Sequence, residues 1–223
     1  MMQQRPSSVP RRGRTHVRWL AVGALAALQL SACAPLVVGG AMVGGTMMYV
    51  DRRSTGAQVE DQSIELKASS RLAELVGDRA HVNVTSYNRT VLLTGEAPTE
   101  ADRVAIEQAV QRLDNVRSTV NELAVALPSS ISTRSNDSFL TTKVKATFVD
   151  AKDLQANAFK VVTERGNVYL MGRVTEREAT RASDLARTVS GVQKVVRVFE
   201  VISEAELAEL QPKNEPAAAT TKK

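Results

Sequence analysis

Hydrophobic positions follow the same pattern twice between residues 61 and 202. The first copy has apolar residues at Ile64, Ala68 and Leu72, and the second has them at Leu140, Val144 and Phe148. Residues spaced by four lie on one face of a helix, so each copy is predicted to open with an amphipathic helix.

Each predicted helix is followed by two segments with the composition of β-strands. They are residues 81–87 and 90–96 in the first copy, and residues 159–164 and 167–173 in the second. Asn88–Arg89 and Arg165–Gly166 separate the segments, which predicts two short hairpins. Gly95 and Gly172 occupy matching positions in the later segments, and we predict a steric role for both, through close backbone approach or a kink.

A second helix and a last strand complete each copy. Thr99 with Asp102, and Thr175 with Glu178, have the spacing of N-terminal helix caps. Asn115 and Gly191 tolerate the left-handed backbone and are predicted to end these helices. The pattern therefore predicts an α+β fold built from two tandem αββαβ modules.

The repeat sets the expected domain organisation. The first module spans residues 61–126, a Ser/Pro-rich linker spans 127–136, and the second module spans 137–202. Residues 203–223 are predicted to form a short helix, capped by Ser203 with Glu206, and a disordered low-complexity tail.

The N-terminus has the pattern of a secreted lipoprotein. Five arginines precede an apolar segment at residues 19–30, and LSAC follows at residues 30–33. LSAC resembles a bacterial lipobox, which implies that residues 1–32 are removed and that Cys33 receives diacylglycerol and an N-acyl chain such as palmitate. An ordinary signal peptide or an uncleaved anchor is the alternative.

Residues 33–60 are predicted to be a lipidated flexible tether, because paired glycines weaken a helix. Their apolar first half could instead lie against the bilayer. Ala34 stands where an aspartate would favour the inner membrane by the lipoprotein sorting rules. The resemblance therefore implies an outer-membrane location, facing the periplasm.

Charge and residue inventory exclude several function classes. The whole chain has 29 Lys+Arg and 24 Asp+Glu, but the leader holds five of the arginines and no acid, which leaves 24 against 24. The high basicity is therefore no evidence for nucleic-acid binding. Cys33 is the one cysteine and His81 the one histidine after the leader, and no catalytic motif or metal-ligand cluster is evident. His81 is predicted to be a partly exposed strand residue. We expect no enzyme activity, no metal, no small-molecule substrate and no cofactor besides the covalent lipid.

The αββαβ order, with a glycine in each central strand and Asn115 or Gly191 before the last strand, resembles the BON domain over nearly all of residues 61–202. With the lipobox, residues 135–144, 163–179 and 189–199 are similar to the division- and outer-membrane-stress-associated lipid-binding lipoproteins. The resemblance implies modules with a three-stranded mixed sheet and two helices on one face, packed together. It also implies that the second module binds anionic phospholipid.

The two copies differ in charge and in aromatic residues. Residues 61–126 have seven Lys+Arg and ten Asp+Glu, whereas residues 138–202 have eleven and seven, and all four phenylalanines lie in the second copy. Phe139 has Ser63 as its counterpart, so the shared fold does not require an aromatic group there. We predict a phospholipid-binding surface on this helix. Its residues are Phe139, Lys143, Lys145, Thr147, Val149 and Lys152. Alternatively, Phe139 is a hydrophobic staple or packs against the first module.

Three functions are compatible with these patterns. The first is a lipoprotein that binds anionic phospholipid and supports envelope integrity, at division sites or under stress. The second is an adaptor that binds outer-membrane protein assembly or envelope-stress machinery. The third is a structural spacer.

Overall fold

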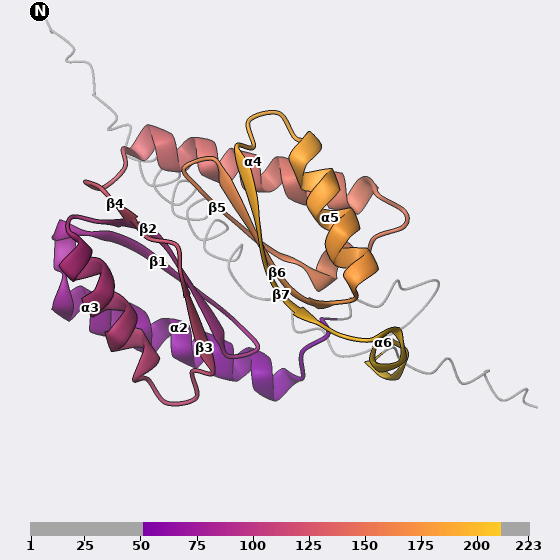
Figure 1. The fold of residues 1–223 in the computed structure, drawn as a ribbon, viewed down its shortest axis with the longest axis horizontal. Helices are drawn as coiled ribbons and strands as arrows, with labels where there is room; N and C mark the ends of the chain where they lie inside the picture. Colours follow the sequence, from indigo (N-terminus) through magenta and orange to yellow (C-terminus); the bar gives the residue numbers. More distant parts are fainter. Residues whose placement is uncertain (1–50, 211–223) are drawn as a thin grey trace, which may run out of the picture. The chain divides into compact units, whose positions relative to one another are not determined.

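A computed structural model of the protein describes residues 51–210 (Figure 1). Cys33, the leader, most of the predicted tether and the C-terminal tail lie outside these residues. Within residues 51–210, no helix has the length and apolar character needed to cross a membrane.

The described residues form two αββαβ modules followed by a short helix, as predicted. The first contains α2 (Thr55–Leu75), η2 (Gly77–Arg79), β1 (His81–Tyr87), β2 (Thr90–Ala97), α3 (Glu100–Gln111), β3 (Ser118–Asn121) and β4 (Ala124–Val125). The second contains α4 (Ile131–Asp150), η3 (Ala156–Ala158), β5 (Lys160–Glu164), β6 (Asn167–Val174), α5 (Glu176–Thr188) and β7 (Lys194–Val201), before α6 (Glu204–Leu210).

The first helix of each module starts earlier than the sequence pattern indicated. α2 begins at Thr55 instead of residue 61, and α4 begins at Ile131 instead of residue 137. Ser54 and Ser130 are the N-caps, since their side chains accept from the amides of Ala57 and Thr133. Part of the predicted tether and most of the predicted linker are therefore helical, because a serine cap was available outside the apolar stripe.

The second helices start at the predicted caps but end before the predicted residues. Thr99 and Thr175 accept from the amides of Asp102 and Glu178. α3 ends at Gln111 and α5 at Thr188, so Asn115 and Gly191 do not end the helices. Asn115 and Gly191 do have positive φ, 68° and 103°, in the loops that lead to the last strands.

Each module contains a mixed sheet of the predicted topology. β1 and β2 are antiparallel, as are β5 and β6, and the last strand pairs with the central strand in parallel. In the first module, β3 and β4 divide this last position, and both pair with β2. Asn88 and Arg89 have φ of 49° and 66°. Positive φ at both residues lets a two-residue hairpin turn match the right-handed twist of the flanking strands.

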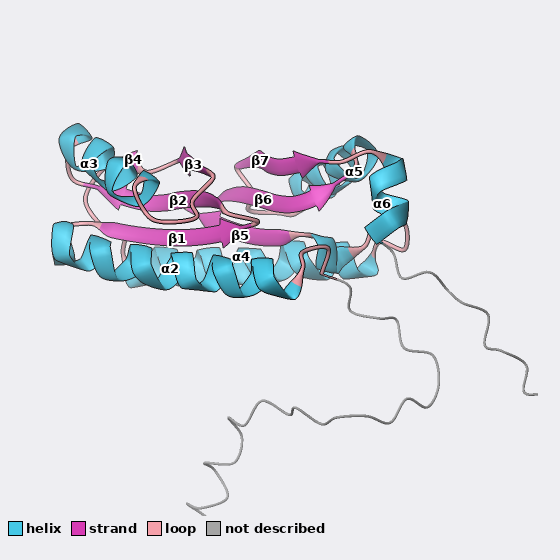
Figure 2. Ribbon diagram, turned by 90° about the horizontal axis from the view of Figure 1, so that it is seen from below, coloured by secondary structure: helices cyan, strands magenta, loops and turns pink. Residues whose placement is uncertain are grey.

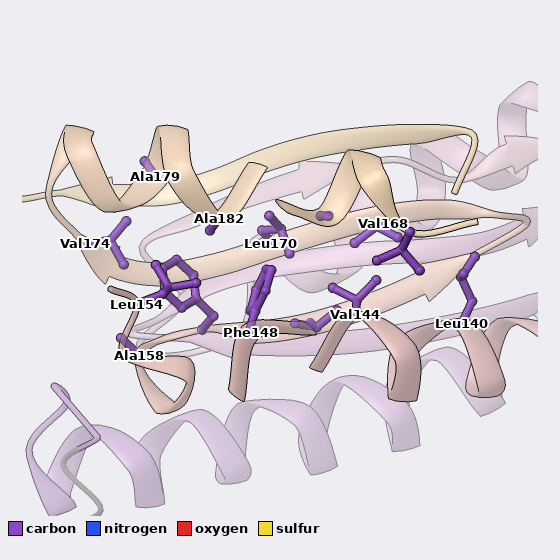
Figure 3. Packing of buried hydrophobic residues seen from close by; sticks show 14 residues of the cluster. Leu140, Val144, Phe148, Leu154, Ala158, Val168, Leu170, Val174, Ala179 and Ala182 are labelled. Carbon is purple, nitrogen blue, oxygen red and sulfur yellow. The ribbon is translucent and has the colours of Figure 1, made fainter. Parts of the chain in front are cut away.

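Alternate residues of the central strands face the helices of their own module. In the second module, Leu140, Val144 and Phe148 of α4 point toward Val168 and Leu170 of β6 (Figure 3). The corresponding cluster of the first module includes Ile64, Ala68 and Leu72 of α2. Figure 2 shows α2 running alongside β1 and α4 alongside β5. The predicted apolar stripes are therefore the cores of the two modules.

The remaining alternate residues form a third cluster that joins the modules. Leu92 of β2 packs with Tyr169 and Met171 of β6, and Tyr87 completes the group. Both faces of β2 and β6 are thus buried, which accounts for their continuous apolar runs. Ion pairs also join the two modules, including one between Lys160 Nζ and Glu65 Oε1 at 2.8 Å.

Candidate functional site

The outer face of α4 combines an exposed aromatic ring with a lysine. Phe139 is 61% exposed, whereas Phe148 on the same helix is 1% exposed. The Lys143 ammonium lies 4.6 Å from the centre of the Phe139 ring, in cation–π contact. The Phe139 ring is therefore neither a buried hydrophobic staple nor covered by the first module. A positively charged ammonium lies beside it.

The exposed face continues along the helix past Phe139. At 3.6 residues per turn, Thr142, Ala146 and Val149 follow Phe139 on the side opposite the buried stripe. All three are exposed, and Val149 is 71% exposed. The residues of this face are uncharged until its end, where Asp150 carries a negative charge.

Two hydroxyl groups on the exposed side of this helix donate to its own backbone. The side chain of Thr142 donates to the Ser138 carbonyl at 3.1 Å, and that of Thr147 donates to the Lys143 carbonyl at 3.0 Å. Such bonds remove the need for water at the hydroxyls. The face is therefore less polar than its sequence suggests.

The six predicted contact residues are spread along α4 and do not converge on one position. Phe139, Lys143 and the partly buried Thr147 lie on one flank of α4, while Lys145 and Val149 lie on the other. Lys152 is exposed but follows the end of the helix. Such a spread is suited to a surface and not to a small enclosed ligand.

A surface hollow of about 680 Å³ adjoins Phe139 and Lys143. Its lining includes Arg165 and Gly191 of the second module, and Glu122 of the first. From the sequence, Arg165 was predicted only to be a turn residue. Its position after β5 places a second basic residue in the lining of this hollow, which also includes the acidic Glu122.

The first module also exposes apolar side chains on its first helix, which the sequence comparison did not anticipate. Leu66 and Val59 of α2 are 68% and 64% exposed. The counterpart of Phe139 in α2 is the polar Ser63, but α2 exposes the apolar side chain of Leu66 nearby. Apolar exposure alone therefore does not distinguish α4 from α2.

The two glycines lie where backbone comes too close for a side chain. A Cβ at Gly95 would overlap the His81 carbonyl oxygen, and one at Gly172 would overlap that of Ala158. Gly95 also has φ of +112°. The neighbour of Gly95 is the first residue of the paired strand β1, and the neighbour of Gly172 is the last residue of η3, shortly before β5.

A buried aspartate holds each hairpin turn, a role that the sequence did not reveal. Asp61 accepts from the amides of Asn88 and Arg89, and also from the Ser86 hydroxyl and the Arg53 guanidinium. Asp137 accepts from the amides of Arg165 and Gly166. Burial alone would raise the pKa of Asp61, but these hydrogen bonds hold it below its usual value.

His81 lies in a polar cluster, and its side chain is 16% exposed. Its Nδ1 is 3.1 Å from Glu96 Oε2 and 4.0 Å from Glu164 Oε1. Burial raises the pKa of Glu164, against the hydrogen bond from Asn83. The prediction of a partly exposed strand residue is confirmed for His81, but the sequence did not reveal its carboxylate neighbours. The register His81 to Glu96 follows from the hairpin, but Glu164 arrives only through packing of the modules.

Comparisons with known proteins match both modules. The BON domain family model matches residues 60–126 and 136–203. The chain is 36% identical over 180 residues to Outer membrane lipoprotein DolP of Haemophilus influenzae, which covers 79% of this chain and 92% of that protein. It is 32% identical over 155 residues to the 21 kDa hemolysin of Actinobacillus pleuropneumoniae, covering 69% and 80% of the two chains.

Among solved structures, the chain is similar to CdsD, a structural protein of the type III secretion system of Chlamydia trachomatis. The TM-score is 0.28 at 11% identity, and the match covers 65% of this chain and 97% of that one. A TM-score this low carries no argument about the fold.

Proposed function

This chain belongs to the BON-domain family and is a two-module outer-membrane lipoprotein similar to DolP, and from that premise we propose that it binds anionic phospholipid through the outer face of α4. The observation that supports this most is the exposed Phe139 ring beside the Lys143 ammonium. An aromatic ring suits the apolar boundary of a bilayer, while the ammonium suits its phosphates.

The expected strength of this contact is modest. Burying a phenylalanine contributes roughly 1.5–3 kcal/mol, and each lysine near an anionic surface about 1 kcal/mol. With two or three lysines the sum is on the order of 4–6 kcal/mol, which corresponds to dissociation constants from about millimolar to tens of micromolar. A chain already held by acyl groups on Cys33 needs no more, because tethering raises the local concentration.

The proposed arrangement has two parts. The acyl chains on Cys33 hold the protein on the periplasmic side of the outer membrane, and α4 selects regions rich in anionic lipid. Through that selection the protein supports envelope integrity, at division sites among others. The role is one of binding and not of catalysis.

A vesicle assay tests the lipid contact. The chain from residue 33 onward, with Cys33→Ser to prevent acylation, is titrated with vesicles of phosphatidylcholine alone or with added phosphatidylglycerol. We expect binding to the anionic vesicles, and Phe139→Glu should weaken it by about 10- to 100-fold. Leu66→Glu is the matched control, since Leu66 is equally exposed on the equivalent helix, and it should change affinity by less than about twofold.

Equal binding to both kinds of vesicle, or equal effects of the two substitutions, would show the proposal to be wrong. A photocrosslinking residue at position 139 separates the adaptor function from lipid binding. Crosslinks to phospholipid support the proposal, whereas crosslinks to an outer-membrane assembly protein support the adaptor.

A further inference from the structure

Three side chains from different strands converge at one end of the cluster that joins the modules. His81 opens β1, Glu96 lies opposite it on β2, and Glu164 ends β5 of the second module. Each offers one ligand atom, and these atoms lie within 4.8 Å of one another. An imidazole with two carboxylates is a set of ligands that Zn²⁺ accepts.

The distances are close to those of a bound metal. In a tetrahedral zinc site with bonds near 2.0–2.2 Å, ligand atoms lie roughly 3.4 Å apart. His81 Nδ1 is 3.1 Å from Glu96 Oε2 and 4.0 Å from Glu164 Oε1. Small rotations of the side chains would therefore close the site.

Within the described residues, the two carboxylates of this cluster have no lysine or arginine partner. The side chains of Glu96 and Glu164 are 1% and 5% exposed. Among residues 51–210, no lysine or arginine forms an ion pair with either of them. Buried charges are normally paired or coordinate metals, so a divalent cation would supply what is missing.

One oxygen of the cluster has no partner at all. Glu96 Oε2 lies near His81 and accepts from the Ser129 amide at 3.1 Å, but Glu96 Oε1 is buried without a hydrogen bond in the described residues. A buried carboxylate oxygen that makes no bond loses its hydration without replacement. A metal bound by both carboxylate oxygens of Glu96 would give Oε1 a partner and remove that cost.

The opposite end of the same seam shows how the repeat compensates charge elsewhere. By the alignment that pairs Gly95 with Gly172, Tyr87 stands for Glu164 and Arg173 for Glu96. There the Arg53 guanidinium lies 4.3 Å from the Tyr87 ring, and Arg173 pairs with Glu200 at 3.1 Å. Cations are thus paired at one end, whereas at the other end, within residues 51–210, His81 is the one basic side chain in contact with Glu96 or Glu164. Arg134 lines the adjoining hollow but forms an ion pair with neither carboxylate.

Supporting groups and access are both present. The Asn83 amide donates to Glu164 Oε2 at 2.8 Å, and the Ser129 amide holds Glu96, as outer partners of metal ligands do. His81 and Glu164 also line a surface hollow of about 340 Å³. This hollow gives an ion a path to the cluster and leaves space for a water as fourth ligand.

We propose that His81, Glu96 and Glu164 form a divalent-cation site of the zinc type that ties the first module to the second. The site is separate from the outer face of α4, and its existence does not depend on lipid binding. Since two ligands come from one module and the third from the other, the bound ion would fix their mutual orientation.

Metal retention tests this site directly. The full chain, isolated in detergent without a polyhistidine tag, is stripped with EDTA and dialysed against ZnCl₂, with MgCl₂ in parallel. We expect one bound zinc per chain and no bound magnesium. Glu164→Gln, which keeps the shape of the side chain, should weaken zinc binding by more than about 100-fold, since even outer partners of ligands are worth about 10- to 100-fold.

Two controls keep the result interpretable. Asp114→Asn removes an exposed carboxylate of the first module and should leave zinc binding unchanged. Hydrogen exchange in β1 and β5 should slow on zinc addition in the parent chain, but not in the Glu164→Gln chain.

The proposal is overturned if the parent chain retains no zinc, or if Glu164→Gln binds zinc as well as the parent does. Zinc retained without slower exchange in β1 and β5 would likewise contradict the joining of the modules. If magnesium binds as tightly as zinc, the cluster is a site for hard divalent cations, and the zinc assignment is wrong.

Discussion

Helices α2 and α4 occupy the same position in the two modules but present different outer faces. Each starts at a serine cap, holds a hairpin turn with a buried aspartate and buries a stripe of three apolar residues. Each also exposes a long apolar side chain, Leu66 at 68% in α2 and Phe139 at 61% in α4. Exposed apolar area is therefore a common property of the repeat, and it does not identify a membrane contact.

Charge is what separates the two faces. Besides Asp61, α2 carries Glu60, Glu65 and Glu74 against Lys67 and Arg71, a balance of −1. Besides Asp137, α4 carries Asp150 against Arg134, Lys143 and Lys145, a balance of +2. A bilayer with anionic lipid attracts the second combination and repels the first. The comparison teaches that the basic flanks, with the aromatic ring, carry the proposed specificity.

The largest expected difference between the modules is in stability, at the matching glycines. Gly95→Ala introduces both a collision with the His81 carbonyl and a side chain at φ of +112°. Gly172→Ala introduces only the collision with the Ala158 carbonyl. We expect losses in unfolding free energy on the order of 4 kcal/mol or more for Gly95 and about 2–3 kcal/mol for Gly172. Urea-induced unfolding measures both, with Gly56→Ala in α2 as a control, since a Cβ there makes only an ordinary contact with Ser54 Oγ at 3.9 Å. Equal losses at Gly95 and Gly172 would show that the backbone conformation contributes nothing.

The next difference concerns the aspartates that hold the hairpins. Asp61 accepts from two side chains besides two amides, whereas Asp137 accepts from two amides. Asp61→Asn should therefore cost roughly 2–4 kcal/mol, because the charged hydrogen bonds from Ser86 and Arg53 are weakened, although Arg53 keeps its ion pair with Asp51 at 2.7 Å. Asp137→Asn should cost about 1–3 kcal/mol. The same unfolding measurement ranks them, and the reverse order would contradict the assigned contacts.

The pH dependence of the Asp61 contribution follows from its lowered pKa. Its folded pKa lies below the unfolded value of about 3.9. The contribution is therefore fully present above about pH 4 and is lost as the pH falls through the folded pKa. Melting temperatures of the parent and the Asp61→Asn chain should differ near pH 7 and converge in acid. A constant difference from pH 7 down to pH 2 would rule out this linkage.

A graft can test whether the face of α4 is sufficient for lipid binding. Ser63→Phe with Ser69→Lys places the counterparts of Phe139 and Lys145 on α2, where Lys67 already matches Lys143. In a chain that also carries Phe139→Glu, the graft should restore anionic vesicle binding by about 10-fold or more, from one ring and one added charge. Ser63→Phe alone is the control for the ring. If the graft restores nothing, the hollow with Arg165 is required besides the helix face.

Much of the fold could be predicted because local chemistry determines it. The turn pairs Asn88–Arg89 and Arg165–Gly166 fixed the hairpins, and the threonine caps fixed the starts of α3 and α5. Early helix starts were missed because the serine caps lie outside the apolar stripe. Leu66 was missed because a search for the stripe ignores apolar residues on the opposite face.

The parts of the site that escaped prediction depend on packing between distant segments. Glu164 meets His81 only because the helix-free faces of two sheets pack together, and no local pattern reports that pairing. The role of Asp61 likewise requires the hairpin to return to the start of the first module. Exposure of Phe139 could be anticipated, because its counterpart in the repeat is a serine.

The smallest expected effect compares the two lysines that occupy equivalent positions, Lys143 and Lys67. Lys143→Gln removes one charge from the proposed contact and leaves Phe139 without its cation, so anionic vesicle binding should weaken about fivefold, or roughly 1 kcal/mol. The dependence of binding on salt should decrease at the same time, because one fewer charge is screened. Lys67→Gln should change neither quantity, since α2 does not face the bilayer in the proposed contact. If both lysines matter equally, the two first helices contact lipid together, and the charge difference between the modules does not select between them.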